Sequence, residues 1–401
     1  MKKVVIIGAG ASGVIASIFA SKNKEVIILE RNSTPLKKLL LTGNGRCNYF
    51  NDNQDISNYN SSNIDLIKQI VTEKNINSVK DFFLSIGIIP KIKDGYYYPY
   101  SNLASSIKMA LLKEASLRGV KIKLDYLVTD VKKINDKFIV NNEMECDYLI
   151  LSTGSKAYPK TGSDGIGYSI LKSFNHKIIK VMPALTQLIG DKSYFKDWAG
   201  IRCEAKVSMY ENNKFIKTEV GELQLTKTGL SGICIFNLSS NIRKGLDKNY
   251  KEEIGVNFIP FVENIEEFLD DRNNKLKNRN IIELLEGIIN YKLLKIILNE
   301  CKINENNNLD YLTFKEKETL YNNLINFKVN IIDTNDFDNA QVCSGGVDLN
   351  EINLNTMESK LVSNLFITGE LLDIDGICGG YNLTLAWISG ILAGSYIGDI
   401  C

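Results

Sequence analysis

The first thirty residues alternate between apolar runs and a small-residue segment in a recognisable order. Residues 3–8 are mostly apolar and end on a glycine, residues 11–23 combine small and apolar residues at helical spacing, and residues 25–30 form a second apolar run. Short apolar runs bounded by turn residues are typical of buried strands. The opening of the chain therefore predicts a strand–helix–strand unit of an α/β fold.

Further periodic segments follow this unit. Apolar residues at helical spacing occur at 64–86 and 102–118, and an aromatic segment at 95–100 predicts a turn and a strand. Residues 49–63 are rich in Asn and Ser and predict an exposed loop. The remaining apolar runs of this region predict strands at about 120–130, at 137–141 and at 146–151.

The pattern changes near residue 183. Apolar and polar residues alternate over 201–209, which predicts a half-buried antiparallel strand. Residues 262–325 are charged and carry an apolar stripe at helical spacing. We therefore expect one domain in two parts with a second domain inserted: the first in residues 1–185 and 336–401, the inserted one in 186–335, β-rich at 186–260 and 328–335 and helical at 261–327.

The glycines at the end of the first strand predict a dinucleotide site. Gly8, Gly10 and Gly13 have the Gly-x-Gly-x-x-Gly spacing, and they stand between a predicted strand and a predicted helix. In that setting they provide a tight turn, close approach of the backbone to a pyrophosphate, and close packing of helix on strand. The helix N-terminus favours phosphate, and Glu30 at the end of the second strand is placed to bind a ribose.

Three later segments favour FAD over NAD. Residues 147–154 form an apolar strand that ends in Thr-Gly, residues 364–370 form another that ends in Gly-Glu, and Gly-Gly-Tyr-Asn at 379–382 opens the last predicted helix. A helix N-terminus there would favour negative charge on a reduced flavin. No second Gly-x-Gly-x-x-Gly occurs, so we expect no separate nicotinamide-binding domain.

The composition and charge of the chain narrow the classes of protein to which it could belong. The chain of 401 residues carries a net charge of +1, so we expect no nucleic-acid partner. Its apolar runs are too short for a membrane span or a secretory signal, and eight scattered cysteines with no Cys-x-x-Cys pair predict reduced thiols. With one histidine, His176, neither a metal cluster nor Ser-His-Asp hydrolysis is expected. We expect a cytoplasmic protein.

The chain resembles the BaiN/YhiN-like NAD(P)/FAD-dependent oxidoreductases, which include aminoacetone oxidase and a bile-acid ring reductase. The motifs that carry the resemblance include Gly-Asn-Gly-Arg-Cys-Asn at 43–48, Tyr-Pro-Tyr-Ser at 98–101, Tyr-Pro-Lys-Thr-Gly-Ser at 158–163, Gly-Leu-Ser-Gly at 229–232 and the segment 369–382. The resemblance implies a split Rossmann-like FAD-binding domain with an inserted β-barrel-like part and a small helical part. The chain departs from the family pattern at Leu36, Lys227 and Ile233.

From the motifs and the resemblance together we expect a set of cofactor-binding residues on several segments. They are Gly8, Gly10, Ala11, Ser12, Gly13, Glu30, Arg31, Lys38, Leu39, Thr42, Gly43, Gly45, Arg46, Cys47, Asn48, Val128, Thr153, Gly154, Gly369, Glu370, Asp375, Gly379, Gly380, Tyr381 and Asn382.

Several roles stay open at this stage. Arg46, Tyr158 and Lys227 are the candidates for catalysis, while a cofactor contact, a packed ring and a solvated lysine are the alternatives. The cysteines at 47, 343 and 378 fit either a redox-active thiol or small buried residues. The tyrosines at 96, 97, 98 and 100 fit either a substrate pocket or core packing. We expect His176 to be structural.

These features predict a flavin-dependent oxidoreductase acting on a small molecule. The first hypothesis is a reductase that takes electrons from transiently bound NAD(P)H and reduces an activated carbon–carbon double bond of an apolar substrate. The alternatives are an amine oxidase of the aminoacetone type that uses oxygen, and a flavin-bound redox sensor without turnover. Neither the substrate nor the oligomeric state follows from the sequence.

Overall fold

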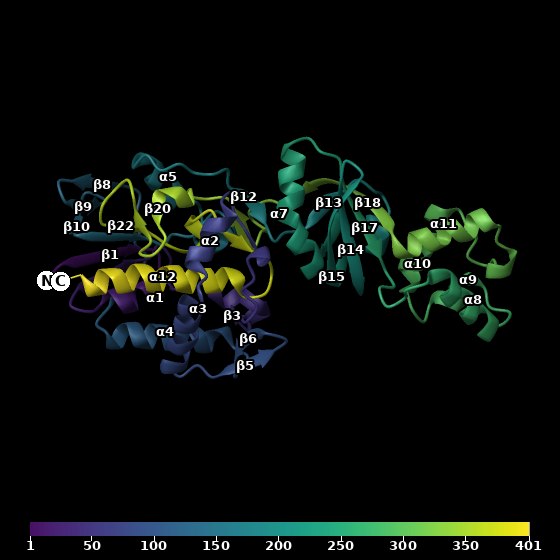
Figure 1. Cartoon of the computed structure of the whole chain (residues 1–401), viewed down its shortest axis with the longest axis horizontal. Helices are drawn as coiled ribbons and strands as arrows, with labels where there is room; N and C mark the ends of the chain where they lie inside the picture. The colour runs from purple at the N-terminus through teal and green to yellow at the C-terminus, as the bar shows by residue number, and fades with distance from the viewer. Residues whose placement is uncertain (401) are drawn as a thin grey trace. The chain divides into compact units, whose positions relative to one another are not determined.

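The computed structural model describes residues 1–400, and the chain divides into two units (Figure 1). The first unit combines Met1–Pro183 with the segment from Ala340 onward, and the second is Ala184–Asn339. The first contains a parallel sheet and the second a closed barrel. The predicted fold class, a split Rossmann-like domain with an inserted barrel and a helical part, is confirmed.

The central sheet of the first unit has the strand order β20-β21-β22-β11-β1-β2-β7, in which β1, β2, β7, β11 and β22 run parallel. Parallel strands covered on both faces are apolar throughout, and β11 is accordingly buried at every position. The strands are β1 (Lys3–Ile7), β2 (Glu25–Leu29), β7 (Lys121–Lys123), β11 (Tyr148–Leu151), β20 (Ile352–Asn353), β21 (Glu358–Ser359) and β22 (Leu365–Ile367).

Helices and small sheets surround this sheet. The helices are α1 (Ala11–Ala20), α2 (Ile64–Ile70), α3 (Glu73–Ser85), α4 (Ala104–Leu117), α5 (Ile166–Ser173) and α12 (Tyr381–Asp399). The smaller sheets are formed by β3 (Phe50–Asn51), β6 (Tyr96–Pro99) and β5 (Pro90–Lys93), by β8 (Val131–Ile134), β9 (Lys137–Val140) and β10 (Met144–Cys146), by β4 (Tyr59–Asn60) with β23 (Asp375–Gly376), and by β12 (Met182–Ala184) with β19 (Val342–Ser344).

Three glycines bring the last helix against the first. Gly390, Gly394 and Gly398 are spaced four apart on α12, and a Cβ at each would collide with the backbone of α1. The two helices therefore lie in direct contact, and α1 and α12 lie side by side in Figure 1. This contact places the N-terminal and C-terminal segments of the chain in one layer.

Two predicted segments differ from the structure. Residues 49–63 do not form an exposed loop, because Phe50 and Tyr59 are buried and lie in β3 and β4. The strand predicted at 120–130 is limited to β7, since its pairing with β2 ends at Lys123. In both cases tertiary packing, which local composition does not reveal, determines the result.

The second unit is a six-stranded antiparallel barrel with a helical part. Alternate residues of β14, Ala205, Val207 and Met209, are fully buried, which gives the barrel its core. The strands are β13 (Leu188–Gly190), β14 (Arg202–Glu211), β15 (Lys214–Thr226), β16 (Gly229–Gly232), β17 (Glu252–Asn257) and β18 (Phe327–Thr334). The helices are α6 (Phe195–Trp198), α7 (Ile233–Asp247), α8 (Ile265–Lys275), α9 (Ile281–Leu285), α10 (Tyr291–Cys301) and α11 (Phe314–Ile325).

Candidate functional site

Four of the predicted cofactor residues lie within two residues of the carboxyl end of a parallel strand. Gly8 follows β1, Glu30 follows β2, Thr153 lies two residues beyond β11, and Gly369 lies two residues beyond β22. These strands are neighbours in the order β22-β11-β1-β2 and run in one direction, so their carboxyl ends lie at the same edge of the sheet. Ligands of open α/β sheets bind at this edge.

The glycines of the first motif have different surroundings. Gly8 has a φ of +103°, and a Cβ there would collide with the Ser152 carbonyl, while a Cβ at Gly13 would collide with the Gly8 carbonyl. At Gly10, the nearest heavy atom to an added Cβ is the Ser152 carbonyl oxygen at 3.9 Å. Gly8 and Gly13 are thus required by the protein itself, whereas the space beside Gly10 is open for a ligand next to the N-terminus of α1.

Glu30 is buried and fixed by backbone groups. The Ala9 N–H donates to its Oε2 at 2.8 Å, and the Asn32 N–H and side-chain amide donate to its Oε1 at 2.8 and 2.7 Å. Two carboxylate oxygens offer about four acceptor positions, so one remains for a hydroxyl donor. Next to it, Arg31 forms an ion pair with Asp164, and Val128 lies buried beyond β7.

The N-terminal and C-terminal motifs meet at Ser12 and Gly369. A Cβ on Gly369, whose φ is +68°, would lie 2.5 Å from the Ser12 Oγ and 3.1 Å from the Ser12 Cβ. The hydroxyls of Ser152 and Thr368, at the ends of neighbouring strands, lie 2.7 Å apart. The two glycine turns are therefore in contact, although almost the whole sequence separates them.

An ion pair links the loop after β2 to the same region. The Lys38 Nζ lies 2.7 Å from the Glu370 Oε2, and the Glu370 Oε1 accepts from the Cys343 N–H at 3.2 Å. Both charged side chains are half-buried. Burial raises the pKa of the Cys343 thiol to about 11, with the Glu370 carboxylate as a second cause, so this cysteine is a thiol at neutral pH.

The segment Gly-Asn-Gly-Arg-Cys-Asn forms a tight left-handed turn after Leu39 and Thr42. Gly43, Asn44 and Gly45 have φ values of +56°, +56° and +82°, and Cys47 has a φ of +59°. Burial raises the pKa of the Cys47 thiol to about 12, which favours the small buried residue over a reactive thiolate. The Asn48 Oδ1 is buried and accepts no hydrogen bond within the described chain, so this turn offers an unused acceptor beside the α12 start.

The start of α12 uses part of its motif internally. Asn382 binds both the Gly376 N–H and the Gly376 carbonyl, at 2.9 and 2.8 Å, and the Asn60 amide donates to Asp375 at 3.1 Å. The ring of Tyr381 packs edge-on against Tyr59. The predicted side chains at 375, 381 and 382 therefore shape the turn. A Cβ at Gly379 would collide with the Tyr96 ring and one at Gly380 with the Phe50 backbone, so the protein itself requires both glycines. The first amides of α12 remain for a ligand.

The catalytic candidates are placed differently. Arg46 is exposed, and its guanidinium carbon lies 5.2 Å from the centre of the Tyr98 ring. Tyr158 is half-buried with a left-handed φ of +56°, one turn before the Thr161 carbonyl that accepts from Asn32. Lys227 is exposed on the turn between β15 and β16 of the second unit. Their catalytic roles stay predictions.

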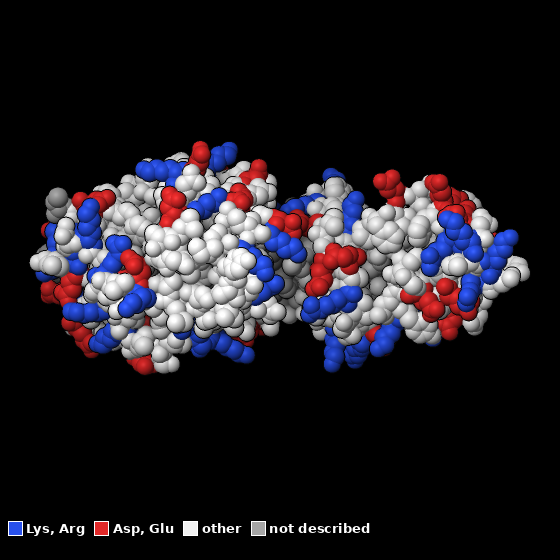
Figure 2. All heavy atoms as spheres, turned by 90° about the horizontal axis from the view of Figure 1, so that it is seen from below, with Lys and Arg blue, Asp and Glu red and all other residues white. Residues whose placement is uncertain are grey.

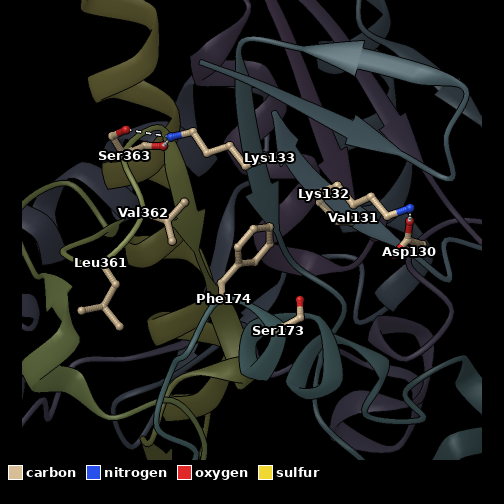
Figure 3. A pocket seen from close by; sticks show the side chains of 9 residues that line it. All are labelled: Asp130, Val131, Lys132, Lys133, Ser173, Phe174, Leu361, Val362 and Ser363. Atoms are coloured by element: carbon tan, nitrogen blue, oxygen red, sulfur yellow. Dashed lines mark hydrogen bonds and ion pairs between the residues drawn. The ribbon is translucent and has the colours of Figure 1, made fainter. Parts of the chain in front are cut away.

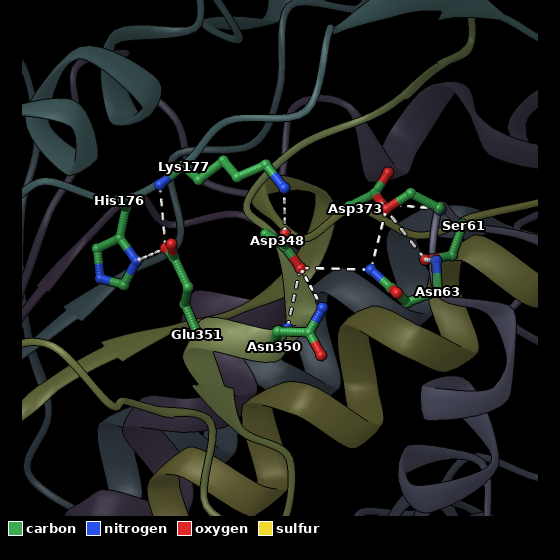
Figure 4. A network of polar contacts seen from close by, with 9 residues as sticks. Ser61, Asn63, His176, Lys177, Asp348, Asn350, Glu351 and Asp373 are labelled. Atoms are coloured by element: carbon green, nitrogen blue, oxygen red, sulfur yellow. Dashed lines mark hydrogen bonds and ion pairs between the residues drawn. The ribbon is translucent and has the colours of Figure 1, made fainter.

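A polar network that the sequence did not reveal supports the C-terminal motif (Figure 4). Buried Asp373 accepts from the Ser62 N–H at 2.9 Å, and buried Asp348 accepts from Lys177 at 2.8 Å. The neighbouring His176 lies 2.8 Å from both the Glu351 carboxylate and the Ser359 hydroxyl. The fully buried histidine connects two loops and the short strand β21, in agreement with a structural role.

A separate hollow of about 650 Å³ contains none of the predicted cofactor residues. It lies between β8, the end of α5 and the loop at 361–363, and Lys133 closes one side by donating to the Ser363 carbonyl and hydroxyl, both at 2.7 Å (Figure 3).

Surface charges of both signs are mixed on the face drawn in Figure 2. No helix of residues 1–400 is both long and apolar enough to cross a membrane, and no group of side chains in that range is arranged to hold a metal. The cysteines of residues 1–400 form no disulfide, and Cys401 lies outside the described residues.

Comparison with known proteins identifies relatives over the full length. The chain is 37% identical over 402 residues to a 3-dehydro-bile acid delta(4,6)-reductase of Clostridium scindens, with 98% of each chain covered. It is 27% identical to a ribosomal RNA dihydrouridine synthase of Escherichia coli, covering 96% of this chain and 95% of that protein. The prediction that nucleic acid is not a partner therefore stays a prediction.

Among solved structures, a flavocytochrome c3 fumarate reductase matches with a TM-score of 0.51 at 14% identity, covering 99% of this chain and 78% of that one. The fold is thus that of a flavoprotein. The HI0933-like protein Rossmann domain matches residues 2–396. The resemblance drawn from the motifs is confirmed: the chain is an oxidoreductase and belongs to the HI0933-like family.

Proposed function

We propose that this chain binds FAD along the carboxyl edge of its parallel sheet and reduces a carbon–carbon double bond conjugated to a carbonyl. The observation that carries the proposal is the contact between Ser12 and Gly369, which brings the two glycine turns together as an elongated dinucleotide would require. The open space at Gly10 and the unused Asn48 acceptor support the same assignment.

The residues present suit the parts of FAD. The space beside Gly10 at the N-terminus of α1 would take the pyrophosphate, and the remaining acceptor position of Glu30 would take an adenosine ribose hydroxyl. The Lys38–Glu370 pair would hold the ribityl hydroxyls, and the first amides of α12 would face the ring. When bound, FAD would supply two-electron chemistry.

The protein's contribution to such a reduction is position and electrostatics. Saturation of a conjugated double bond adds a hydride equivalent at the β carbon and a proton at the α carbon. The amides at the start of α12 provide positive potential, worth up to ~2 kcal/mol when partly buried. Tyr158 is the candidate proton donor that the sequence suggested, and NAD(P)H is the proposed electron source.

The relative at 37% identity, named 3-dehydro-bile acid delta(4,6)-reductase, supports the proposed substrate class. We therefore expect an apolar 3-oxo-4-ene substrate. In an anaerobic cuvette, NADH or NADPH should bleach the flavin colour of the purified protein, and a 3-oxo-4-ene bile acid should restore it. Bleaching by aminoacetone alone would instead indicate the amine oxidase, and a flavin inert to all of these would overturn both enzymatic assignments.

A second candidate reaction is the reduction of uracil in ribosomal RNA. The relative at 27% identity carries that name, and the uracil double bond is also conjugated to a carbonyl. Incubation of the reduced protein with deproteinised ribosomal RNA, followed by mass spectrometry of the nucleosides, tests it. Dihydrouridine formed at a higher rate than the saturated bile acid would make this the main activity.

A further inference from the structure

The hairpin formed by β5 and β6 has a fixed register. The two strands are joined by Asp94 and Gly95, whose φ values of +51° and +81° are those of a two-residue type I′ turn. A hairpin closed in this way cannot slip by one residue without turning every side chain to the opposite face. The turn therefore decides which side chains of the hairpin face the rest of the unit.

The register places two lysines and two tyrosines on one face. Lys93 pairs with Tyr96, and Lys91 pairs with Tyr98. Directly opposed residues of an antiparallel pair project from the same side of the sheet. The intervening Tyr97 projects from the other side and is buried in the aromatic core, so the run of tyrosines divides between packing and this hairpin face, which we define as Lys91, Lys93, Tyr96 and Tyr98.

The hairpin face lies against two of the segments predicted to bind the cofactor, one of them the start of α12. The Tyr96 Cε1 is 2.8 Å from the position that a Cβ on Gly379 would take, and the Tyr98 Cε1 is 3.5 Å from the corresponding position on Gly43. Arg46, from the same turn as Gly43, stacks its guanidinium on the Tyr98 ring. The face therefore borders the ring end of the proposed site.

Three positive charges at this border have no carboxylate partner. Lys91, Lys93 and Arg46 are exposed, and within residues 1–400 none of them forms an ion pair. Arg46 uses its Nε to donate to the Gly43 carbonyl at 3.2 Å, which leaves its terminal nitrogens available. Cations beside aromatic rings suit a ligand with an anionic group and an apolar body.

We propose that the hairpin face and Arg46 select substrates by binding a carboxylate carried on an apolar ring system. This inference rests on the proposed function and adds the part of the site that recognises substrate charge. Three cations match one carboxylate, whereas nucleic-acid binding proteins commonly neutralise about six to ten phosphates. RNA is for this reason an outcome of the test and not the proposal.

The test compares a 3-oxo-4-ene bile acid with its methyl ester, which has the same rings but no charge. Binding to the oxidised holoprotein is measured by titration calorimetry at two salt concentrations, and KM and kcat are measured with both compounds. The variant is Lys91→Ala/Lys93→Ala. The control is Lys172→Ala, which removes an exposed lysine from α5, on the opposite side of the first unit in Figure 1.

We expect the double variant to weaken carboxylate binding about five- to tenfold, as for two exposed charge pairs. Its Kd should lose most of its salt dependence, kcat should change less than about twofold, and the ester should bind equally to all proteins. Equal losses for acid and ester, or an unchanged Kd for the acid, would overturn the proposal. Salt-dependent binding of ribosomal RNA that is lost in the double variant, with no preference for acid over ester, would overturn it in favour of RNA.

Because calorimetry measures binding without reduction, it tests this inference independently of the proposed function. If the acid binds better than the ester but neither is reduced, the hairpin assignment stands and the proposed reaction fails. If both are reduced with equal Kd values in every variant, the reaction stands and the hairpin assignment fails.

Discussion

A buried carboxyl in the barrel predicts a stability that falls as the pH rises. Glu252, at the start of β17, is 1% exposed, and neither of its carboxylate oxygens has a hydrogen-bond partner within the described chain. It pairs across the strands with Glu211, and the backbone of α7 at Gly245 packs against it. Burial, and then the Glu211 carboxylate, raise the pKa of Glu252 from 4.5 to about 7.

The sign and size of the effect follow from linkage. Between pH 4.5 and 7 the unfolded chain releases this proton while the folded chain retains it, so the free energy of unfolding falls over that window. At about 1.4 kcal/mol for each pH unit, the loss is about 3 kcal/mol in all, most of it between pH 5 and pH 8. Glu252→Gln cannot ionise and should remove this part of the pH dependence.

The assay depends on each unit of the protein containing one tryptophan. The chain has two tryptophans, Trp198 buried in the second unit and Trp387 buried in the first. In a Trp387→Phe background, urea unfolding followed by fluorescence reports on the second unit alone. Glu204→Gln, an exposed position on β14, is the control and should retain the original pH dependence. If Glu252→Gln loses as much stability from pH 5 to pH 8 as its parent, the reasoning is refuted.

Four glycine substitutions test the cofactor site and its support. Gly10→Val should leave thermal stability near that of the parent, because the added side chain meets open space, but give colourless protein, because that space is proposed for the FAD pyrophosphate. Gly13→Val should fail to yield soluble protein, since its Cβ would collide with the backbone. A yellow Gly10→Val protein would contradict the site. Gly380→Val should weaken FAD while retaining ADP by calorimetry, since its Cβ would lie 2.8 Å from the Phe50 carbonyl carbon at the ring end only; loss of ADP as well would contradict this division. Gly394→Leu should lower the free energy of unfolding of the first unit by about 1–3 kcal/mol through overpacking against α1, and an unchanged urea midpoint of Trp387 fluorescence would contradict the packing.

The sequence was most informative where one local pattern determines one local structure. The glycine motif between an apolar run and a helical segment predicted β1 and α1, because Gly13 packs directly on the Gly8 carbonyl within the motif itself. Alternation over 201–209 predicted β14 for the same reason. Such patterns need no knowledge of distant residues.

Features that depend on tertiary contacts or on strand register were not predicted. The burial of Tyr59 follows from its contact with Tyr381, and the facing of Tyr96 and Tyr98 follows from a strand register set by a turn. The internal use of Asn382 depends on the Gly376 backbone, which the motif alone does not show. Which side chains of the motif hold the turn, and which are left at the proposed site, is therefore decided by these contacts and not by the motif itself.

The separation of Lys38 and Glu370 has a consequence for biosynthesis. These ion-pair partners are 332 residues apart in the sequence. At ribosomal rates of roughly 5–20 residues per second, roughly 15–70 s pass between the synthesis of Lys38 and the synthesis of Glu370. The barrel, encoded by one continuous stretch in between, is complete before that moment, so the nascent protein exposes an unfinished sheet until the segment around Glu370 has been synthesised, and it needs protection during that interval.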